Sequence, residues 1–198
     1  MVKVGFIVEG DTEKILLESK NFKDWTKNIG IDICHPIENA KGSGNLLPKH
    51  IVPLVEQLKL QDPTHIIILT DLENDPDKQS VIDRIGTDHT QLIFIAVKAI
   101  EAWFLADTLA LNKWLKLEGV YEDFPEATPE MPWDRLKALA SEHNKRGPGG
   151  SKPVFATQMT KHHGFSLERA ADHVNCPSAT EFYNFLLNLD INYLLEDL

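Results

Sequence analysis

Short apolar runs alternate with longer amphipathic segments through the first 117 residues. The runs are rich in β-branched residues and adjoin glycine or proline, which favours strands over helices. They cover residues 2–8, 31–37, 65–71 and 91–97. The third run, HIIILTD, is apolar almost throughout, which is typical of a central parallel strand covered on both faces.

The segments between these runs have the periodicity of helices. The expected helices cover residues 11–29, 46–60, 77–86 and 98–117, and the second should kink or restart at Pro53. Strands that alternate with helices imply parallel strands, right-handed crossovers and helices on both faces of the sheet. The sequence therefore predicts an α/β domain over residues 1–117, with a parallel sheet of about four strands.

The pattern changes after residue 117. Residues 118–134 hold six acids, three prolines and no base, which indicates a loop. A helix is expected near 133–144, a Gly/Pro loop over 145–153, and two helices in the final segment, 166–198. We expect residues 118–198 to form a mostly helical extension packed on the α/β domain rather than an independent domain.

Carboxylates follow the predicted strands. Glu9, Asp71 and Glu73 lie at or just past the ends of strands, and Glu101 begins the fourth strand-to-helix junction. Ligands of parallel sheets bind beyond the carboxyl ends of the strands, so these four side chains should converge. Hard cations such as Mg²⁺ or Mn²⁺ prefer oxygen ligands, and a cation would relieve the repulsion within such a cluster. Glu9 is also placed to act as a general acid or base.

Acidic residues near the starts of helices can instead serve the fold alone. Asp11 and Glu13 suit the first turn of a helix, where negative charge complements the helix dipole. Asp107 could cap or pair on its helix. Glu101 stands among apolar neighbours, and its burial requires either a metal ion or a base such as Lys98.

Charge is distributed unevenly along the chain. The net charge of −10 argues against broad electrostatic attraction to nucleic acid or to anionic membranes. Residues 143–167, however, contain no acid. This segment and the loop at 40–45 supply candidate phosphate-binding residues: Lys41, Lys145, Arg146, Lys152 and Lys161.

The remaining composition favours a cytoplasmic protein. No apolar run approaches the roughly 20 residues of a membrane span, so no membrane partner is expected. The N-terminus lacks a signal-peptide pattern. Cys34 and Cys176 are far apart and lack metal-ligand spacing, which favours two buried free thiols.

Three motifs resemble a known family. Val8-Glu9-Gly10 and Asp71-Leu72-Glu73 resemble the TOPRIM domain of topoisomerases, primases and OLD-family (overcoming lysogenization defect) nucleases. The stretch IEAWFLAD, 100–107, is similar to a signature of a bacterial TOPRIM-like family of unknown function, which is itself similar to OLD nucleases and often associated with phage defence. The resemblance covers roughly residues 2–115 and implies a TOPRIM-like (Rossmann-like) fold.

The resemblance also implies roles for single residues. Glu9 would match the TOPRIM glutamate, a general acid/base or metal-orienting group, and Asp71 with Glu73 would match the metal-binding pair. TOPRIM domains commonly have Asp where this chain has Glu73, and this departure implies a metal geometry that differs by the reach of one methylene. Glu101 would hold a second metal. No tyrosine is placed to match a topoisomerase nucleophile.

Three functions remain open at this point. The first is a Mg²⁺- or Mn²⁺-dependent phosphodiester hydrolase, a nuclease acting on DNA or RNA in bacterial defence or DNA processing. The second is a non-catalytic TOPRIM-like protein whose C-terminal helices bind a protein partner. The third is a receiver-like phosphoacceptor module that would use Glu9, Asp11, Asp71 and Lys98.

Overall fold

A parallel sheet forms the centre of the molecule. The computed structural model describes residues 1–90 and 92–196, with side chains as far as residue 189. Its five strands are β1 (Val2–Val8), β2 (Ile31–Ile33), β3 (Glu38–Asn39), β4 (His65–Asp71) and β5 (Ile93–Ala96). All pairings are parallel, in the order β2-β1-β4-β5, and β3 also pairs with β1. The predicted α/β fold with a parallel sheet is confirmed.

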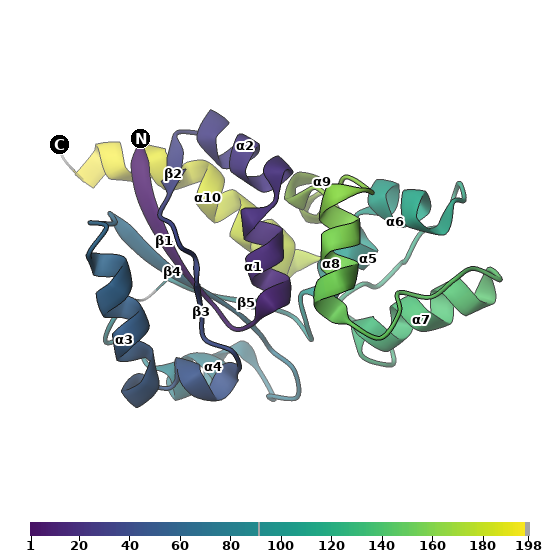
Figure 1. Ribbon diagram of the computed structural model, residues 1–198, viewed down its shortest axis with the longest axis horizontal. Helices are drawn as coiled ribbons and strands as arrows, with labels where there is room; N and C mark the ends of the chain where they lie inside the picture. Colours follow the sequence, from purple (N-terminus) through teal and green to yellow (C-terminus); the bar gives the residue numbers. More distant parts are fainter. Residues whose placement is uncertain (91, 197–198) are drawn as a thin grey trace.

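Helices cover both faces of this sheet (Figure 1). They are α1 (Asp11–Glu18), α2 (Lys20–Asn28), the 3₁₀ turn η1 (Ser43–Leu46), α3 (Pro48–Lys59), α4 (Lys78–Ile85), α5 (Glu101–Ala106), α6 (Thr108–Leu115), α7 (Pro132–Glu142), α8 (Lys152–Lys161), α9 (Leu167–Ala171) and α10 (Pro177–Glu196). Because side chains alternate along a strand, β1, β4 and β5 each supply both layers. Ile7 and Ile68 pack toward α3 and α4, whereas Phe6 and Leu69 pack in the core that includes α1, α5 and α10.

The last helix, α10, is part of this second layer. Phe182 lies in its second turn, and the ring contacts Phe6 and Phe94 of the sheet and Trp103 of α5, with centroids 5.3 to 6.3 Å apart. Aromatic pairs at this spacing add to the stability gained from burial alone. Residues from beyond 118 therefore complete the core of the sheet that the first part of the chain builds.

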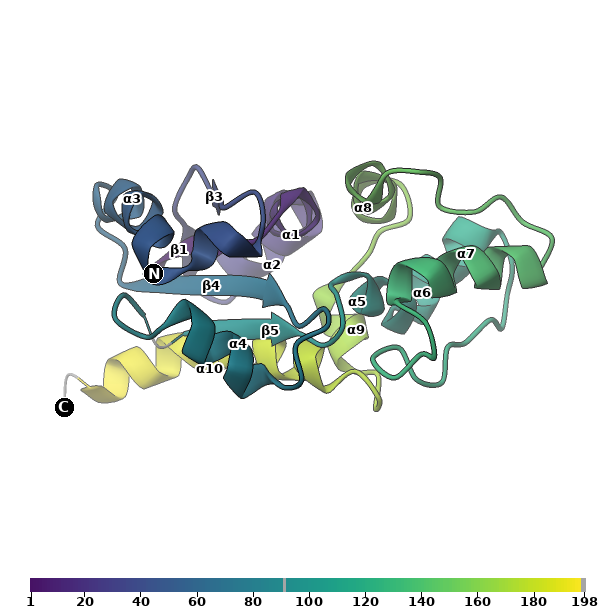
Figure 2. The ribbon, with the colours of Figure 1, turned by 90° about the horizontal axis from the view of Figure 1, so that it is seen from below.

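The remaining helices gather beyond the carboxyl ends of the strands. In Figure 2 the arrowheads of β4 and β5 point toward α5, with α6 and α7 farther along the molecule. Helix α8 folds back to pack against α1. This arrangement puts the start of α8 next to the end of the sheet where the acidic side chains lie.

Two expected helices are each split in two. Ser19 accepts a hydrogen bond from the backbone N–H of Phe22 and starts α2, and Asp107 accepts one from Ala110 and starts α6. Such side chains end one helix and cap the next, a local preference that hydrophobic periodicity does not reveal. The expected restart at Pro53 was wrong. Helix α3 runs through it without a break, from Pro48 to Lys59.

Other differences concern which elements form and where they begin and end. Strand β3 and helix α8 were not predicted, and the strand expected over 31–37 stops at Ile33. Residue 91, where the fourth strand was expected to begin, and residues 197–198 lie outside the described part of the chain. Both cysteines are buried free thiols, as expected. Within the described residues, no helix combines the length and the apolar character needed to cross a membrane.

Candidate functional site

Glu9 leaves the end of β1 with its carboxylate held in place. Its Oε2 accepts a hydrogen bond from the Thr70 hydroxyl at 2.5 Å and one from the Asp71 backbone N–H at 3.3 Å. Both donors belong to the neighbouring strand β4, which pairs with β1 in parallel register. Two donors on one oxygen fix the orientation of a half-buried carboxylate at the carboxyl edge of the sheet.

Asp71 ends β4 and is 9% exposed. Its Oδ1 accepts a hydrogen bond from the Ile100 backbone N–H at 2.8 Å, which links β4 to the start of α5. Burial raises the pKa of Asp71 well above its usual value, and the negative charges of Glu13, Glu101 and Glu9 raise it further. Four carboxylates from separate segments therefore interact at this edge.

Glu13 is the member of this group that sequence reasoning assigned to a helix terminus only. That role is confirmed, because its Oε2 accepts from the backbone N–H of Gly10 at 3.0 Å. The side chain is also 4% exposed, and burial together with Glu9 and Glu101 raises its pKa to about 7. The available signal was the spacing: a glutamate that reaches back to the N-cap of α1 must lie beside the residue before the N-cap, which is Glu9.

Glu101 is the first residue of α5 and is 1% exposed. Its Oε2 pairs with the Lys152 ammonium at 3.0 Å, while its Oε1 is buried without a hydrogen-bond partner among the described residues. Burial raises the pKa of Glu101 although Lys152 opposes the shift. A partner was expected for this carboxylate, and it comes from α8 rather than from Lys98.

Lys98 points elsewhere. Its ammonium donates to the backbone carbonyls of Thr128 and Glu130 and so anchors the acidic loop before α7. Asp11 is exposed, and its carboxylate accepts from the Asn39 side chain at 2.7 Å. The geometry therefore does not gather the groups that a receiver-like phosphoacceptor needs around Asp71.

Glu73 stands apart from the buried group. Its backbone adopts a left-handed conformation (φ 49°) and donates to the Lys98 carbonyl at 2.7 Å, and its side chain is exposed. Within the described part of the chain, no hydrogen bond or ion pair involves its carboxylate. Glu73 and Asp71 thus lie two residues apart but in different environments.

The candidate phosphate-binding residues fall into three places. Lys41 is exposed in the loop next to Gly42, whose N–H donates to the Glu9 carbonyl at 2.8 Å. Lys152 forms an ion pair with one of the carboxylates, that of Glu101. Lys145 and Arg146 lie in the loop before α8, and Lys161 is at the other end of that helix, about 13 Å from Lys152 along the axis.

Asp107 has a structural role. It is fully buried, and each carboxylate oxygen accepts a hydrogen bond from the Arg169 guanidinium at 2.8 Å. It also caps α6 at Ala110 and accepts from the Ser166 backbone N–H at 2.8 Å. The acid therefore fastens the junction of α5 and α6 to α9. The expected capping role is confirmed, and the ion-pair partner lies on α9 rather than on the helix of Asp107.

Replacing Asp107 with Ala should destabilise the protein by about 3 kcal/mol, because it leaves a partly buried guanidinium and two backbone donors without their acceptor. Chemical denaturation measures this change. Asp134→Ala removes an exposed carboxylate paired with Lys137 and serves as the control, with an expected change below about 1 kcal/mol. Equal losses in the two variants would contradict the structural role.

The acidic group has the donor chemistry of a hard-cation site. It offers only oxygens, and one of them, Glu101 Oε1, is buried without a hydrogen-bond partner in the part of the chain that the structure describes. As they stand, the described residues contain no group of three or more His, Cys, Asp or Glu side chains already arranged to hold a metal ion. Binding a cation would require the carboxylates to turn toward one another, which their mutual repulsion opposes until the cation is present.

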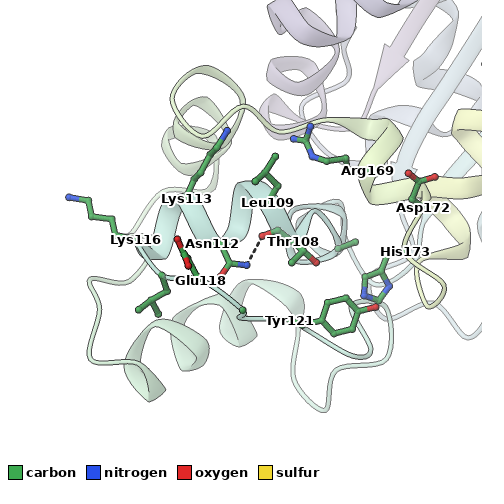
Figure 3. A pocket seen from close by; sticks show the side chains of 13 residues that line it. Thr108, Leu109, Asn112, Lys113, Lys116, Glu118, Tyr121, Arg169, Asp172 and His173 are labelled. Carbon is green, nitrogen blue, oxygen red and sulfur yellow. Dashed lines mark hydrogen bonds between the residues drawn. The ribbon is translucent and has the colours of Figure 1, made fainter.

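A cavity lies away from these carboxylates. This cavity of about 850 Å³ is bounded by α6, the chain that follows it and α9, and Figure 3 shows its side chains. Tyr121 stacks on His173 with ring centroids 4.8 Å apart, and the His173 ring also bonds to the Glu122 carbonyl at 2.9 Å. Arg169 is held by Asp107. Arg169 and His173 of this cavity are therefore held by contacts that serve the fold, whereas the raised carboxylate pKa values lie at the sheet edge.

Comparisons with known proteins are sparse. No family model and no curated protein matches the chain. Among solved structures, the chain is similar to the C-terminal region of the Xanthomonas campestris pv. campestris OLD protein, with 22% identity and a TM-score of 0.38. The match covers 91% of this chain and 97% of that chain. Similarity at this level does not assign a family, and the site rests on its own geometry.

Proposed function

We propose that this protein is a Mg²⁺- or Mn²⁺-dependent phosphodiester hydrolase, a nuclease acting on DNA or RNA. The observation that carries the proposal is the set of buried carboxylates of Glu13, Asp71 and Glu101, whose pKa values are all raised. Buried like charges at the carboxyl edge of a parallel sheet are costly for the fold and are typical of functional sites. The resemblance to TOPRIM domains supports the same activity and a bacterial defence or DNA-processing role.

Asp71 and Glu101 would hold the cation, with Glu9 beside it. A bound divalent cation would stabilise the charge that develops on the phosphate oxygens. The Thr70 hydroxyl occupies Glu9 Oε2, and the described residues provide no hydrogen bond to Oε1. Glu9 Oε1 can therefore accept a proton from an attacking water. The exposed carboxylate of Glu73 would lie on the solvent side of the site and add charge there without holding the cation.

Lys152 would have two tasks in this site. Its ammonium orients Glu101 through the 3.0 Å ion pair, and it is 42% exposed, so a substrate phosphate can also reach it. Since the N-terminus of α8 lies at the same place, the helix dipole adds positive potential there. Binding of an anionic substrate beside acidic ligands requires such local positive charge.

The test is cleavage of DNA and RNA by wild type and by Glu9→Gln, each with Mg²⁺, Mn²⁺ or EDTA. Glutamine keeps an oxygen for the Thr70 hydroxyl but is not a base, so we expect the fold to survive and cleavage to fall about a hundredfold or more. Calorimetric titration with Mn²⁺ provides a second readout. Metal binding without cleavage of any nucleic acid would favour the non-catalytic, partner-binding alternative.

A further inference from the structure

A second cavity lies near the carboxylates, and the side chains that line it are basic rather than acidic. This cavity of about 450 Å³ is formed by the end of α6, the loop before α8 and the outer side of α8. Its lining includes four basic side chains: Lys116, Lys145, Arg146 and His163. The described residues that line it include no Asp or Glu, although the chain has 30 acidic residues and a net charge of −10.

These basic side chains are not neutralised by the protein itself. Among residues 1–90 and 92–189, none of the four makes an ion pair, whereas Lys152 next to the cavity pairs with Glu101. The pKa of His163 is lowered by burial and by the positive charges of His162, Lys113 and Lys116. Positive charge is therefore concentrated around the cavity, and an anion would relieve the repulsion.

The loop that borders the cavity contains two glycines that leave its backbone accessible. Gly147 and Gly150 do not have positive φ values, and a Cβ added to either would meet no protein atom within 4 Å. The fold itself therefore does not require glycine at these two positions. Close approach of a ligand to the backbone is a common reason for such glycines, and their N–H groups can donate to phosphate oxygens.

The cavity also has an aromatic wall. Trp114 of α6 lines it and is held by an edge-to-face contact with Phe155, 5.0 Å between centroids. Fixed aromatic rings next to positive charge are the usual platform for a nucleobase and its phosphate. A cavity of about 450 Å³ is within the usual size range of small-molecule sites and has room for one nucleotide.

We propose that this cavity binds one unpaired nucleotide of a single-stranded nucleic acid, with its phosphate against Lys145 and Arg146 and its base beside Trp114. The proposal rests on the function proposed above and names its substrate class. Ser151 lines the cavity and precedes Lys152, whose ammonium contacts Glu101. A strand held in the cavity would therefore continue past Lys152 to the carboxylates.

An unpaired base is required because a stacked and paired base cannot enter a hollow between a loop and a helix. In a duplex, the base would first have to be unstacked, at a cost that single strands and frayed ends avoid. We therefore expect tighter binding of single strands than of blunt duplexes.

The experiment measures binding in EDTA, so that cleavage does not interfere. Fluorescence anisotropy of a labelled oligothymidine is followed at increasing salt for wild type and for Lys145→Ala/Arg146→Ala. The double variant should bind about tenfold more weakly or worse, because it loses charge-assisted hydrogen bonds. The slope of log affinity against log salt should become shallower by about 0.7, which corresponds to the loss of one neutralised phosphate.

Two controls separate the cavity from general charge effects. Lys27→Ala/Lys49→Ala removes the same number of charges from exposed positions on α2 and α3 and should leave affinity unchanged. Gly150→Val keeps every charge and places a side chain where the protein leaves open space, so it should weaken binding without lowering stability. Equal affinity for blunt duplex and single strand, or wild-type affinity of the Lys145→Ala/Arg146→Ala variant, would overturn the proposal.

The same variants distinguish this proposal from the proposed hydrolase activity. Specific binding of the single strand in EDTA, without cleavage after Mg²⁺ or Mn²⁺ is added, would support the cavity and count against the nuclease. Metal-dependent cleavage that proceeds at the wild-type rate in Lys145→Ala/Arg146→Ala at low substrate concentration would support the nuclease and reject the cavity.

Discussion

Replacing Asp71 with Asn should lower metal-dependent cleavage about a thousandfold and leave the folded protein at least as stable as wild type. A carboxylate that holds the cation contributes several kcal/mol to the stabilisation of transition-state charge, and each 1.36 kcal/mol is a factor of ten in rate. The amide oxygen of Asn can still accept a hydrogen bond from the Ile100 N–H. The variant also removes a buried carboxyl group whose pKa is strongly raised. Activity and stability are therefore expected to move in opposite directions.

Glu73→Gln is the matched comparison for this variant. It also replaces a carboxylate by an amide, two residues away, but the side chain is exposed and lies outside the buried group. An exposed charge contributes up to about 1 kcal/mol, so we expect at most a tenfold loss of cleavage. Single-turnover rates and denaturation midpoints of the two variants measure both effects.

Two outcomes would contradict these roles. If Asp71→Asn unfolds more easily than wild type, the carboxylate is needed by the fold rather than by a cation. If Glu73→Gln loses as much activity as Asp71→Asn, the residue moves into the site when metal binds, and the pair after β4 acts as the TOPRIM resemblance implies.

The sheet and its acidic edge could be predicted because both depend on local patterns. The apolar run HIIILTD indicated a buried strand, and parallel strands bring their carboxyl ends to one edge. Glu9, Asp71 and Glu101 were found in this way, and their interactions confirm that the side chains lie near one another.

The basic partner of this edge could not be predicted in the same way. Lys152 is 51 residues from Glu101, and it reaches the site because α8 packs on α1. Helix α8 has weak amphipathic character and follows a glycine-rich loop, so the sequence pattern gave little sign of it. Glu13 was missed for a different reason: one side chain both caps α1 and enters the acidic group, and the capping role alone explains its position in the sequence.

Glu13 leads to the second large effect, which concerns stability and pH. Its pKa is raised from 4.5 to about 7, so the folded protein binds more protons than the unfolded chain between these two values. Stability must then fall as pH rises through this window and level off above about pH 7. The shift in the pKa of Glu13 corresponds to a loss of about 3 kcal/mol in the free energy of unfolding. Asp71 and Glu101 act in the same direction, because their pKa values are raised too.

Glu13→Gln should therefore be more stable than wild type by about 3 kcal/mol at pH 8 in EDTA, and equally stable near pH 4. Glutamine retains an oxygen for the Gly10 N–H, so the cap of α1 is kept while the charge is removed. Glu18→Gln, at the half-exposed other end of α1, is the control and should follow the wild-type curve. Denaturant titrations across this pH range give the three curves.

Divalent cations connect this stability to the proposed function. Mg²⁺ or Mn²⁺ should raise the melting temperature of wild type near pH 8, where the carboxylates are charged, and much less near pH 5, where protons compete for the same oxygens. Glu13→Gln should gain less from the cation, since part of the repulsion that the cation relieves is already gone. A wild-type stability that instead rises between about pH 5 and pH 8 without metal would show that these carboxylates do not share one buried site, and the proposed metal site would lose its physical basis.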